Sequence, residues 1–411
     1  MDRRRVVVTG LGVVASNGVG VDAFWRANAE GRSGLAPIDA FDPQDLPARI
    51  AGQVRGFAPA DFFPAELASR TDRFVHFGLA TAAMAFAQSG LDPARENLER
   101  VGVIVGSGLG GQLFHEEQMA AAIARGDLRV NPIAVARITP NAVAGQLAIR
   151  HGLLGPSLVI STACASGAHA IGEAFRKIQH GEADVCLAGG VEAPLTPFNF
   201  AAYAAMRVLS KRNDDPAGAS RPFDRGRDGF VMGEGGAMLV LEERDRAMRR
   251  GAPILAEIAG YAGNSGAHHM VIPEPGGRDA ARVMAAALRD ARLAGVDYIN
   301  AHATSTKAND VAETRAIHAV LGPAAATTPV SATKSMIGHA LGAAGAIEAA
   351  VCVLSLVHQL IPPTINLDDP DPECALDHVR GAARAARLGS VMSNSFGFGS
   401  CNATLVFTAH P

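Results

Sequence analysis

The chain contains 411 residues, carries a formal net charge of −3 from 37 basic and 40 acidic side chains, and is 48% hydrophobic. A charge this close to zero predicts no nucleic-acid footprint, although it leaves room for a local basic patch. The length is enough for two or three ordinary domains, or for one large duplicated unit with a sizeable core.

Short runs of valine and isoleucine alternate with alanine-rich segments of helical periodicity from the N-terminus onward. In the first part of the chain we expect strands and helices at residues 5–9, 74–88, 102–105, 142–150, 158–160, 165–178, 185–188 and 237–241, and a basic helix near 244–250. This alternation predicts an α/β fold whose strands are largely buried.

The same pattern restarts beyond residue 250. We expect the elements of the second part at residues 253–258, 280–294, 298–300, 311–320, 329–331, 343–360, 390–394 and 403–407. In both parts a strand delivers a polar residue to the start of a small-residue helix, namely Cys164 in the first and His339 in the second. We therefore expect an internal duplication with halves 1–250 and 251–411, and an active site between them.

Five cysteines form an odd set without the paired spacing of a zinc site or a disulfide framework. They are Cys164, Cys186, Cys352, Cys374 and Cys401. The basic N-terminus lacks a following cleavage site, and the apolar run at 346–363 contains Glu348 and His358 and is too short for a bilayer. We expect a soluble cytoplasmic protein that holds no metal and binds no membrane.

Two glycine-rich turns match the spacing of a dinucleotide-binding motif. They lie at residues 10–15 and 106–111, each after an expected strand. The first lacks a second strand ending in an acidic residue at the usual distance, and the second runs directly into Gln112-Leu-Phe-His-Glu-Glu. We expect no nicotinamide cofactor, because glycine turns also occur wherever backbones approach closely.

Cys164 lies at an expected strand-to-helix turn. The run Leu158-Val-Ile-Ser-Thr-Ala-Cys-Ala-Ser-Gly ends in small residues, and alanine, isoleucine and phenylalanine then recur at helical spacing. A thiol at a helix N-terminus ionises more easily and becomes a better nucleophile. The alternative is a small cysteine packed beneath the helix, because free cysteine is among the most buried residue types.

Four further stretches place polar groups on turns, where functional residues tend to lie. They are Asn300 to Thr306, Ser331 to His339, Ser393 to Asn402 and Phe223 to Gly236. Taken singly, each is compatible with a hydrogen-bonded core histidine, a surface lysine or an ordinary glycine turn. A cysteine at a helix start, two histidines and a lysine together favour thioester chemistry.

These motifs resemble those of the β-ketoacyl-[acyl carrier protein] synthases of the thiolase-like condensing-enzyme superfamily, and most closely the type II elongating synthases. The likeness includes Thr162-Ala-Cys164, Asn300-Ala-His302, Lys334-Ser-Met-Ile-Gly-His339 and Asn394-Ser-Phe-Gly-Phe398-Gly, all in family order. It extends from the first expected strand to the last.

The resemblance implies a five-layered α-β-α-β-α fold of two similar halves, normally dimeric, and a reaction without a cofactor. Cys164 would take an acyl group from acyl carrier protein. Malonyl carrier protein would then lose carbon dioxide, and its carbanion would attack the acyl-enzyme to give a 3-oxoacyl chain two carbons longer.

The resemblance also implies the catalytic roles. His302 and His339 would donate N–H groups to the malonyl thioester carbonyl and stabilise the enolate formed on decarboxylation. The backbone N–H groups of Cys164 and Phe398 would form the oxyanion hole. Lys334 would be buried and paired with Glu348, since an unpaired buried ammonium is expensive.

Substrate contacts follow from the same resemblance. Thr304 and Thr306 would hydrogen-bond the phosphopantetheine arm, and Phe396 belongs to the substrate-binding set. Phe398 would also act as a gate that admits malonyl only after Cys164 is acylated. Leu109 matches a position that lines or blocks the acyl pocket.

Carrier proteins are acidic, so their binding needs a basic rim. The candidates are Arg70, Arg73, Arg207 and Arg212, of which Arg70 and Arg207 resemble family contact sites. Each of the four can equally be a solvated surface arginine.

The chain departs from the family pattern at two turns. Ala303 and Lys307 replace the usual glycine and proline after His302, and Ser400-Cys401 replaces a Gly-Thr pair. A methyl group at 303 should reshape the pantetheine channel, and Ser400 should restrict the gate. We lean toward a type II polyketide or other specialised pathway over housekeeping fatty-acid synthesis.

Two other functions compete with this hypothesis. A non-catalytic chain-length factor works as a partner subunit of a ketosynthase heterodimer, but its cysteine is typically replaced, whereas Cys164 is present. A thiolase-like or initiating synthase uses coenzyme A substrates and a Cys-His-Asn set, whereas this chain has His339 in the second basic position.

Overall fold

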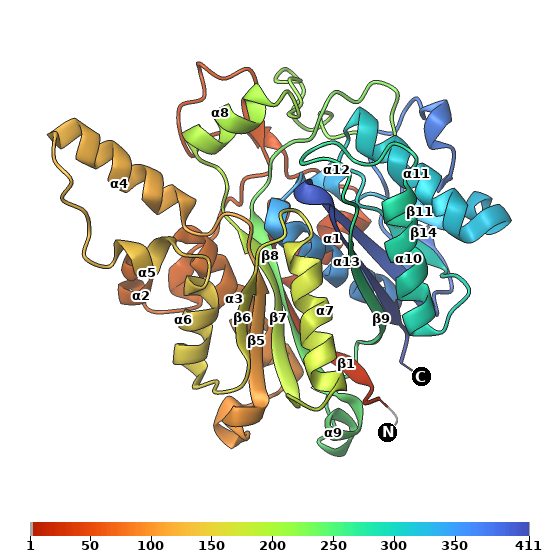
Figure 1. Ribbon diagram of the computed structural model, residues 1–411, viewed down its shortest axis with the longest axis horizontal. Helices are drawn as coiled ribbons and strands as arrows, with labels where there is room; N and C mark the ends of the chain where they lie inside the picture. Colours follow the sequence, from red (N-terminus) through yellow and green to blue (C-terminus); the bar gives the residue numbers. More distant parts are fainter. Residues whose placement is uncertain (1–2, 411) are drawn as a thin grey trace.

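The chain folds around one large mixed β-sheet in the computed structural model, which describes residues 3–410 (Figure 1). Its twelve strands include an unbroken path in the order β13-β11-β10-β15-β16-β9-β1-β8-β7-β5-β6, with β2 beside β1. Their bounds are β1 (Val6–Ala15), β2 (Gly18–Val19), β5 (Val101–Gly106), β6 (Ser157–Ile160), β7 (Val185–Glu192), β8 (Gly235–Glu243), β9 (Ala256–Ser265), β10 (Tyr298–Asn300), β11 (Pro329–Ser331), β13 (Asp377–His378), β15 (Ser390–Gly397) and β16 (Cys401–Thr408).

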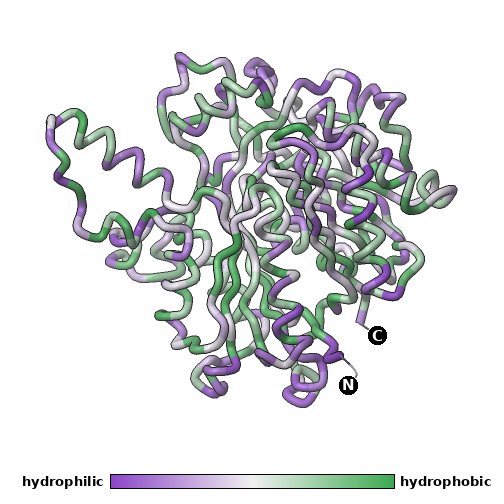
Figure 2. The backbone as a smooth tube through the Cα atoms, viewed as in Figure 1, coloured by the Kyte–Doolittle hydropathy of each residue, from purple (hydrophilic) through white to green (hydrophobic). Residues whose placement is uncertain are grey.

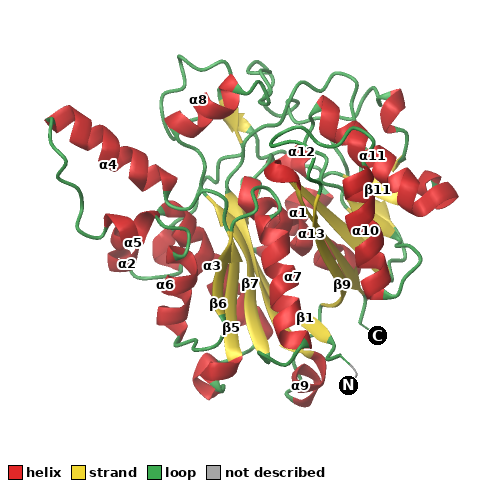
Figure 3. Ribbon diagram, viewed as in Figure 1, coloured by secondary structure: helices red, strands yellow, loops and turns green. Residues whose placement is uncertain are grey.

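Helices flank these strands, as the colouring by secondary structure shows (Figure 3). The α-helices are α1 (Val21–Ala29), α2 (Ala65–Arg70), α3 (Arg73–Ser89), α4 (Gln112–Arg125), α5 (Ala134–Ile138), α6 (Ala142–His151), α7 (Ser166–Gln179), α8 (Pro197–Ala205), α9 (Arg244–Arg249), α10 (Arg278–Ala291), α11 (Lys307–Leu321), α12 (Lys334–Ile337) and α13 (Ala344–His358). Two small sheets pair β3 (Ala36–Pro37) with β4 (Ile50–Ala51), and β12 (Leu360–Ile361) with β14 (Arg384–Ala385). Every segment expected from the hydrophobic pattern is present, with bounds shifted by a few residues.

The strand order is the same in both parts of the chain. The first part forms the run β6-β5-β7-β8-β1 and the second the run β11-β10-β15-β16-β9, so each begins with its third strand and ends with its first. In each run the first three strands are parallel and the remaining neighbours antiparallel. The runs join where Val6–Val8 of β1 pair with Ala256–Ile258 of β9.

Three buried clusters hold the helices to the sheet. Helices α3 and α6 cover one face of the first run, and α10 and α11 cover the outer face of the second. Helices α7 and α13 share the central cluster with β1, β8 and β9 and contact each other. The apolar colouring of β5 and β7 fits strands covered on both faces (Figure 2), whereas the edge strand β6 is partly exposed.

Helix α13 explains the longest apolar stretch of the sequence. The stretch Leu341–His358 is apolar enough to cross a membrane, yet 89% of it is buried inside the protein. A helix that is hydrophobic all round belongs in the core of a large protein or in a membrane. The expectation of a buried core helix is confirmed.

The excursion between β5 and β6 departs from what the pattern predicts. Helix α4 projects from the body of the molecule, and α5 returns beside α2 and α6 (Figure 1). Helices α4 and α5 and the turn between them expose large apolar side chains, including Ile123, Leu128 and Val135. Apolar residues on this arm therefore form no core within the described chain.

Candidate active site

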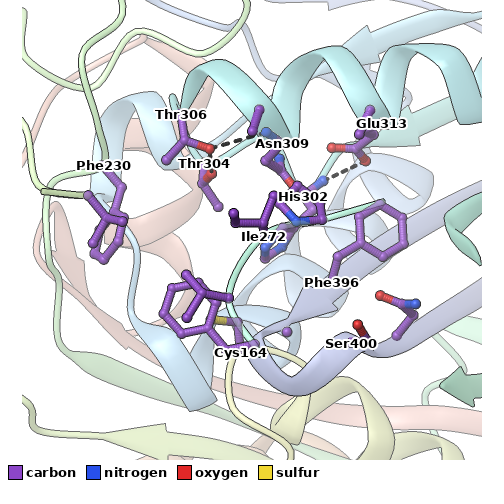
Figure 4. A pocket seen from close by; sticks show the side chains of 18 of the residues that line it. Cys164, Phe230, Ile272, His302, Thr304, Thr306, Asn309, Glu313, Phe396 and Ser400 are labelled. Atoms are coloured by element: carbon purple, nitrogen blue, oxygen red, sulfur yellow. Dashed lines mark hydrogen bonds between the residues drawn. The ribbon is translucent and has the colours of Figure 1, made fainter. Parts of the chain in front are cut away.

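Cys164, His302 and His339 meet at one end of the sheet, although 175 positions separate the first from the last in the numbering. Cys164 follows β6, His302 follows β10, and His339 follows β11 and α12. All three line a single pocket. Figure 4 shows the Cys164 sulfur and the His302 ring facing the same space. The structure therefore brings together the thiol and the two imidazoles that the motifs predicted to share one site.

Two glycines allow this meeting, because they bring the starts of α7 and α13 into contact. A Cβ added to Gly167 would lie 2.9 Å from the Ala346 backbone nitrogen. A Cβ added to Gly345 would lie 2.8 Å from the Ala168 Cβ. Contacts this short do not occur between real side chains, so the small residues that open both helices set the separation of the two halves.

The Cys164 thiol is buried and stays protonated in the resting site. Burial raises the pKa of this thiol to about 11. The Lys334 ammonium and the backbone N–H groups of Phe398 and Cys164 lower the pKa, but by less than burial raises it. The expectation of an easily ionised thiol is wrong for this structure. Helix α7 begins only at Ser166, and desolvation outweighs the favourable groups.

His302 and His339 form a perpendicular pair. Their ring centroids lie 5.4 Å apart with the planes at 84°, and each residue is 2% exposed. Burial and the nearby Lys334 ammonium hold the pKa of both rings well below the ordinary value. Both imidazoles are therefore neutral near pH 7, with one N–H donor and one acceptor each.

Lys334 lies behind the His302 ring and is completely enclosed. Its Nζ donates to Glu348 Oε1 and, at 2.7 Å, to the His302 carbonyl oxygen. Nζ also lies 3.4 Å from His302 Nδ1. Since an ammonium has only donors, Nδ1 accepts, and the His302 ring proton stays on Nε2. The ion pair expected between Lys334 and Glu348 is present.

Glu313 on α11 is a site residue that the motifs did not identify. Its carboxylate accepts the backbone N–H groups of His302 at 2.9 Å and of Ala303 at 2.7 Å. It also accepts from Asn394 at 3.2 Å. Burial raises the pKa of Glu313 to about 7. An acidic residue between the apolar Ala312 and Ala316 of a buried helix face was the available signal.

Glu192 at the end of β7 is a second buried glutamate whose carboxylate accepts backbone N–H groups near the pocket. Its carboxylate accepts from the backbone N–H groups of Gly108, Leu109 and Gly342, and from the Ser107 hydroxyl. It thus ties the glycine turn that carries Leu109 to the segment after His339. Leu109 itself packs against the apolar cluster that contains Cys164.

The remaining predicted substrate contacts lie around the pocket. Thr304 and Thr306 face each other with their hydroxyl oxygens 3.0 Å apart, and Thr306 caps α11 by accepting from the Asn309 backbone N–H. The Phe396 ring lies 5.7 Å from His302. The Phe398 ring stacks on the Tyr203 ring with centroids 6.4 Å apart, and both residues line the pocket together with Cys164.

The four arginines proposed for a carrier-binding rim divide into two pairs. Arg70 and Arg207 are exposed, and Arg70 pairs only with the exposed Glu66. Arg73 makes two hydrogen bonds to the buried Glu234, and Arg212 donates to the Gly226 carbonyl. The expectation is corrected for Arg73, because a guanidinium held this way is not free for a partner.

The comparisons with known proteins agree with this geometry. The family model "Beta-ketoacyl synthase, N-terminal domain" matches residues 3–247, and "Beta-ketoacyl synthase, C-terminal domain" matches residues 255–368. A 3-oxoacyl-[acyl-carrier-protein] synthase 2 from Synechocystis is 46% identical over 409 residues, covering 99% of this chain and 98% of the relative.

Two solved structures are similar over the whole of both chains. The ishigamide ketosynthase/chain length factor matches with a TM-score of 0.93 at 34% identity. A type II polyketide synthase acyl-carrier protein in complex with its ketosynthase matches with a TM-score of 0.91 at 35% identity. Both cover 100% of this chain. The chain therefore belongs to the β-ketoacyl synthase family and is an acyltransferase of the 3-oxoacyl-[acyl-carrier-protein] synthase type.

Proposed function

We propose that this enzyme extends an acyl chain by two carbons through decarboxylative Claisen condensation with malonyl-[acyl carrier protein]. The observation that carries the proposal is the convergence of one thiol and two neutral imidazoles on a single pocket. The reaction proceeds in two half-reactions: the first leaves an acyl group on Cys164, and the second restores the free Cys164 thiol.

In the first half-reaction Cys164 attacks the thioester of the acyl carrier protein. A new carbon–sulfur bond forms to Cys164, the bond to the pantetheine sulfur breaks, and the proton of the Cys164 thiol ends on the departing sulfur. Because burial keeps this thiol protonated, attack and proton loss are coupled. The N–H groups of Cys164 and Phe398 stabilise the tetrahedral oxyanion between these steps.

In the second half-reaction the malonyl thioester loses carbon dioxide, and negative charge develops on its carbonyl oxygen. The two imidazoles are neutral, so each can donate one N–H to this oxygen without surrendering a proton. Lys334 holds the required tautomer of His302. The carbanion then attacks the acyl carbon, and Cys164 leaves as a thiolate that takes up a proton.

The substrate path follows from the pocket lining. Thr304 and Thr306 offer hydroxyl groups to the phosphopantetheine arm, and Phe396 lines the same pocket beside His302. Phe398 swings aside to admit malonyl after acylation. Leu109 closes the far end of the acyl pocket. The exposed Arg70 and Arg207 receive the acidic carrier protein, to which similar ketosynthases bind in solved complexes.

We further propose that the halves 1–250 and 251–411 are duplicated units stacked as five layers, α-β-α-β-α. Identical strand orders and the central position of α7 and α13 support this architecture. The unpaired edge strand β6 and the apolar arm of α4 and α5 support a dimer with a second ketosynthase-fold chain. The enzyme works in the cytoplasm, as a homodimer or with a chain-length factor.

We place the enzyme in a type II polyketide or other specialised pathway. The support is the pair of departures at Ala303 and Ser400, both of which set a side chain on a left-handed backbone where glycine would be unstrained. Copurification from the native host, with the mass of the bound carrier, tests this assignment. Recovery of only the housekeeping fatty-acid carrier would contradict it.

A non-catalytic chain-length factor is the second candidate, since one structural relative contains such a subunit. The presence of Cys164 together with both histidines argues against it. Incubation with an acyl carrier thioester separates the two, because the enzyme should gain the acyl mass on Cys164. Modification elsewhere, with Cys164 free, would overturn the proposed nucleophile.

Cys164→Gln sharpens this test. The variant should lose condensation entirely yet still decarboxylate malonyl-[acyl carrier protein], because the two histidines remain. Cys186→Ala is the matched control, since Cys186 is also buried but lies in strand β7 outside the pocket lining. Loss of both activities in Cys164→Gln would contradict the division of labour.

A further inference from the structure

Ser400 joins two walls of the pocket. One wall is the turn Phe398–Ser400, and the other is the loop of residues 266–273 between β9 and α10. His269, Val271, Ile272 and Pro273 from this loop line the pocket together with Phe398 and Ser400. In Figure 4 Ile272 lies over the space between His302 and Cys164, and Ser400 lies at the edge of that space.

Two kinds of hydrogen bond connect the walls. Gly266 N–H donates to the Ser400 carbonyl and Gly399 N–H to the Met270 carbonyl, both at 2.8 Å. Both join backbone to backbone and would persist with any residue at position 400, and the first continues the ladder between β16 and β9, in which Cys401 pairs with Ser265. The other two depend on the Ser400 hydroxyl, which accepts from His268 N–H at 3.3 Å and donates to the His269 carbonyl at 3.2 Å.

The loop has few other attachments. Its residues 267–270 are exposed, and Met270 and Ile272 present 74% and 51% of their surface to solvent. Its internal support comes from His269 Nδ1, which accepts the N–H groups of Val271 and Ile272, each at 3.0 Å. This makes a compact turn within the loop but does not anchor it to the protein body.

The Ser400 backbone is the second observation. Ser400 has φ of 58°, a left-handed conformation that glycine adopts without strain and serine does not. A strained residue persists where its surroundings hold it in place. In this conformation the hydroxyl makes both of its bonds to the loop.

We propose that the Ser400 hydroxyl is a positioning group that clamps the 266–273 loop to the Phe398 turn. The two walls then move as one unit, and access to Cys164 requires them to part together. The clamp makes the enzyme slower to admit small molecules to the thiol. The effect of this clamp on catalysis rests on the proposed function, whereas its effect on loop exchange and on thiol access can be measured without a substrate.

The test compares three variants by two measurements that need no carrier protein. Ser400→Ala removes the hydroxyl but keeps the strained Cβ, and Ser400→Gly removes both. Ser265→Ala is the control, because Ser265 is exposed at the base of the same loop and its hydroxyl makes no hydrogen bond among the described residues. The measurements are amide hydrogen exchange of residues 268–272 and the rate of Cys164 alkylation by iodoacetamide.

In both Ser400→Ala and Ser400→Gly, amide exchange of these residues and alkylation of Cys164 should be about 5- to 10-fold faster than in the wild type, the ratio expected for losing two long hydrogen bonds that each contribute near the lower end of the usual range. Ser265→Ala should match the wild type. Thermal unfolding of each variant confirms that the fold is intact. A Ser400→Ala rate within twofold of the wild type overturns the clamp, and so does acceleration in Ser400→Gly alone.

Discussion

The two halves of the molecule present different chemical groups at the same place in their strand orders. Cys164 follows β6, the third strand of the first half, and His339 follows β11, the third strand of the second. Apolar side chains such as Leu195, Phe200 and Leu209 surround the cysteine. The buried ions Lys334 and Glu348 lie beside the histidines.

This difference shows that the position of the reactive groups and their protonation have separate physical causes in this fold. The repeated strand order and the glycines at the helix starts determine where the reactive groups stand. Burial and buried charge determine their protonation: the thiol is kept neutral by desolvation, and the imidazoles by desolvation plus an ammonium. The predictions below disturb one half at a time.

The largest effect should follow from disrupting the buried ion pair of the second half. Lys334→Met leaves Glu348 unpaired, and breaking a buried pair costs about 3–5 kcal/mol of folding free energy. Chemical denaturation of the variant measures this loss. Lys334→Met with Glu348→Gln should recover most of the stability but not decarboxylation, because His302 still lacks the group that fixes its tautomer. Full recovery of activity would contradict the positioning role.

Removing one imidazole should be the next largest effect. His339→Ala should lower malonyl decarboxylation by about 10²- to 10³-fold, the usual loss for one donor to a developing oxyanion. His339→Gln keeps a neutral N–H donor and should retain part of the rate. Steady-state release of carbon dioxide measures both, and equal rates for the two variants would argue that His339 acts by something other than N–H donation.

The thiol of the first half should show its buried state in a pH profile. With a pKa of about 11, the thiolate fraction of Cys164 increases tenfold per pH unit from pH 7 to 10. The rate of alkylation by iodoacetamide should therefore rise throughout that range, without the levelling-off above about pH 9.5 that an unperturbed cysteine with a pKa of about 8.5 gives. Mass spectrometry of the Cys164 peptide follows the rate. A plateau below pH 9 would show that the helix start outweighs desolvation.

The smallest effect concerns chain length in the first half. Leu109→Ala removes a side chain that packs against the cluster around Cys164, so longer acyl chains should be accepted with little loss of rate. Product masses from a mixture of acyl carrier substrates report the shift. Leu128→Ala, on the exposed arm, is the control and should leave product length unchanged. Unchanged products in Leu109→Ala would remove Leu109 from the acyl pocket.

Much of this organisation could be predicted from the residues, and the exceptions have physical causes. Strand and helix periodicity located the elements, and ordered motifs identified Cys164, His302 and His339. Glu192 and Glu313 escaped notice because most of their partners are backbone N–H groups, and no motif marks such partners in the sequence.

The other exceptions depend on tertiary contacts. Arg73 was predicted to be a surface residue because its partner Glu234 lies 161 positions away, and no neighbouring residue indicates that the two side chains pair. The thiol pKa was misjudged because helix position is visible in a sequence and depth of burial is not. The arm of α4 and α5 was missed because its apolar residues face solvent in the single chain.

Strand β1 has a consequence for how the chain is synthesised and how it can be divided. It is synthesised before the other strands of the sheet, yet it lies at the seam of the finished sheet, with β8 on one side and β9 on the other. The seam cannot close until residue 258 has emerged. A break near residue 250 would leave Val6–Val8 on one fragment and Ala256–Ile258 on the other, so two coexpressed fragments would regain a complete pocket only if these strands paired again and α7 packed again on α13.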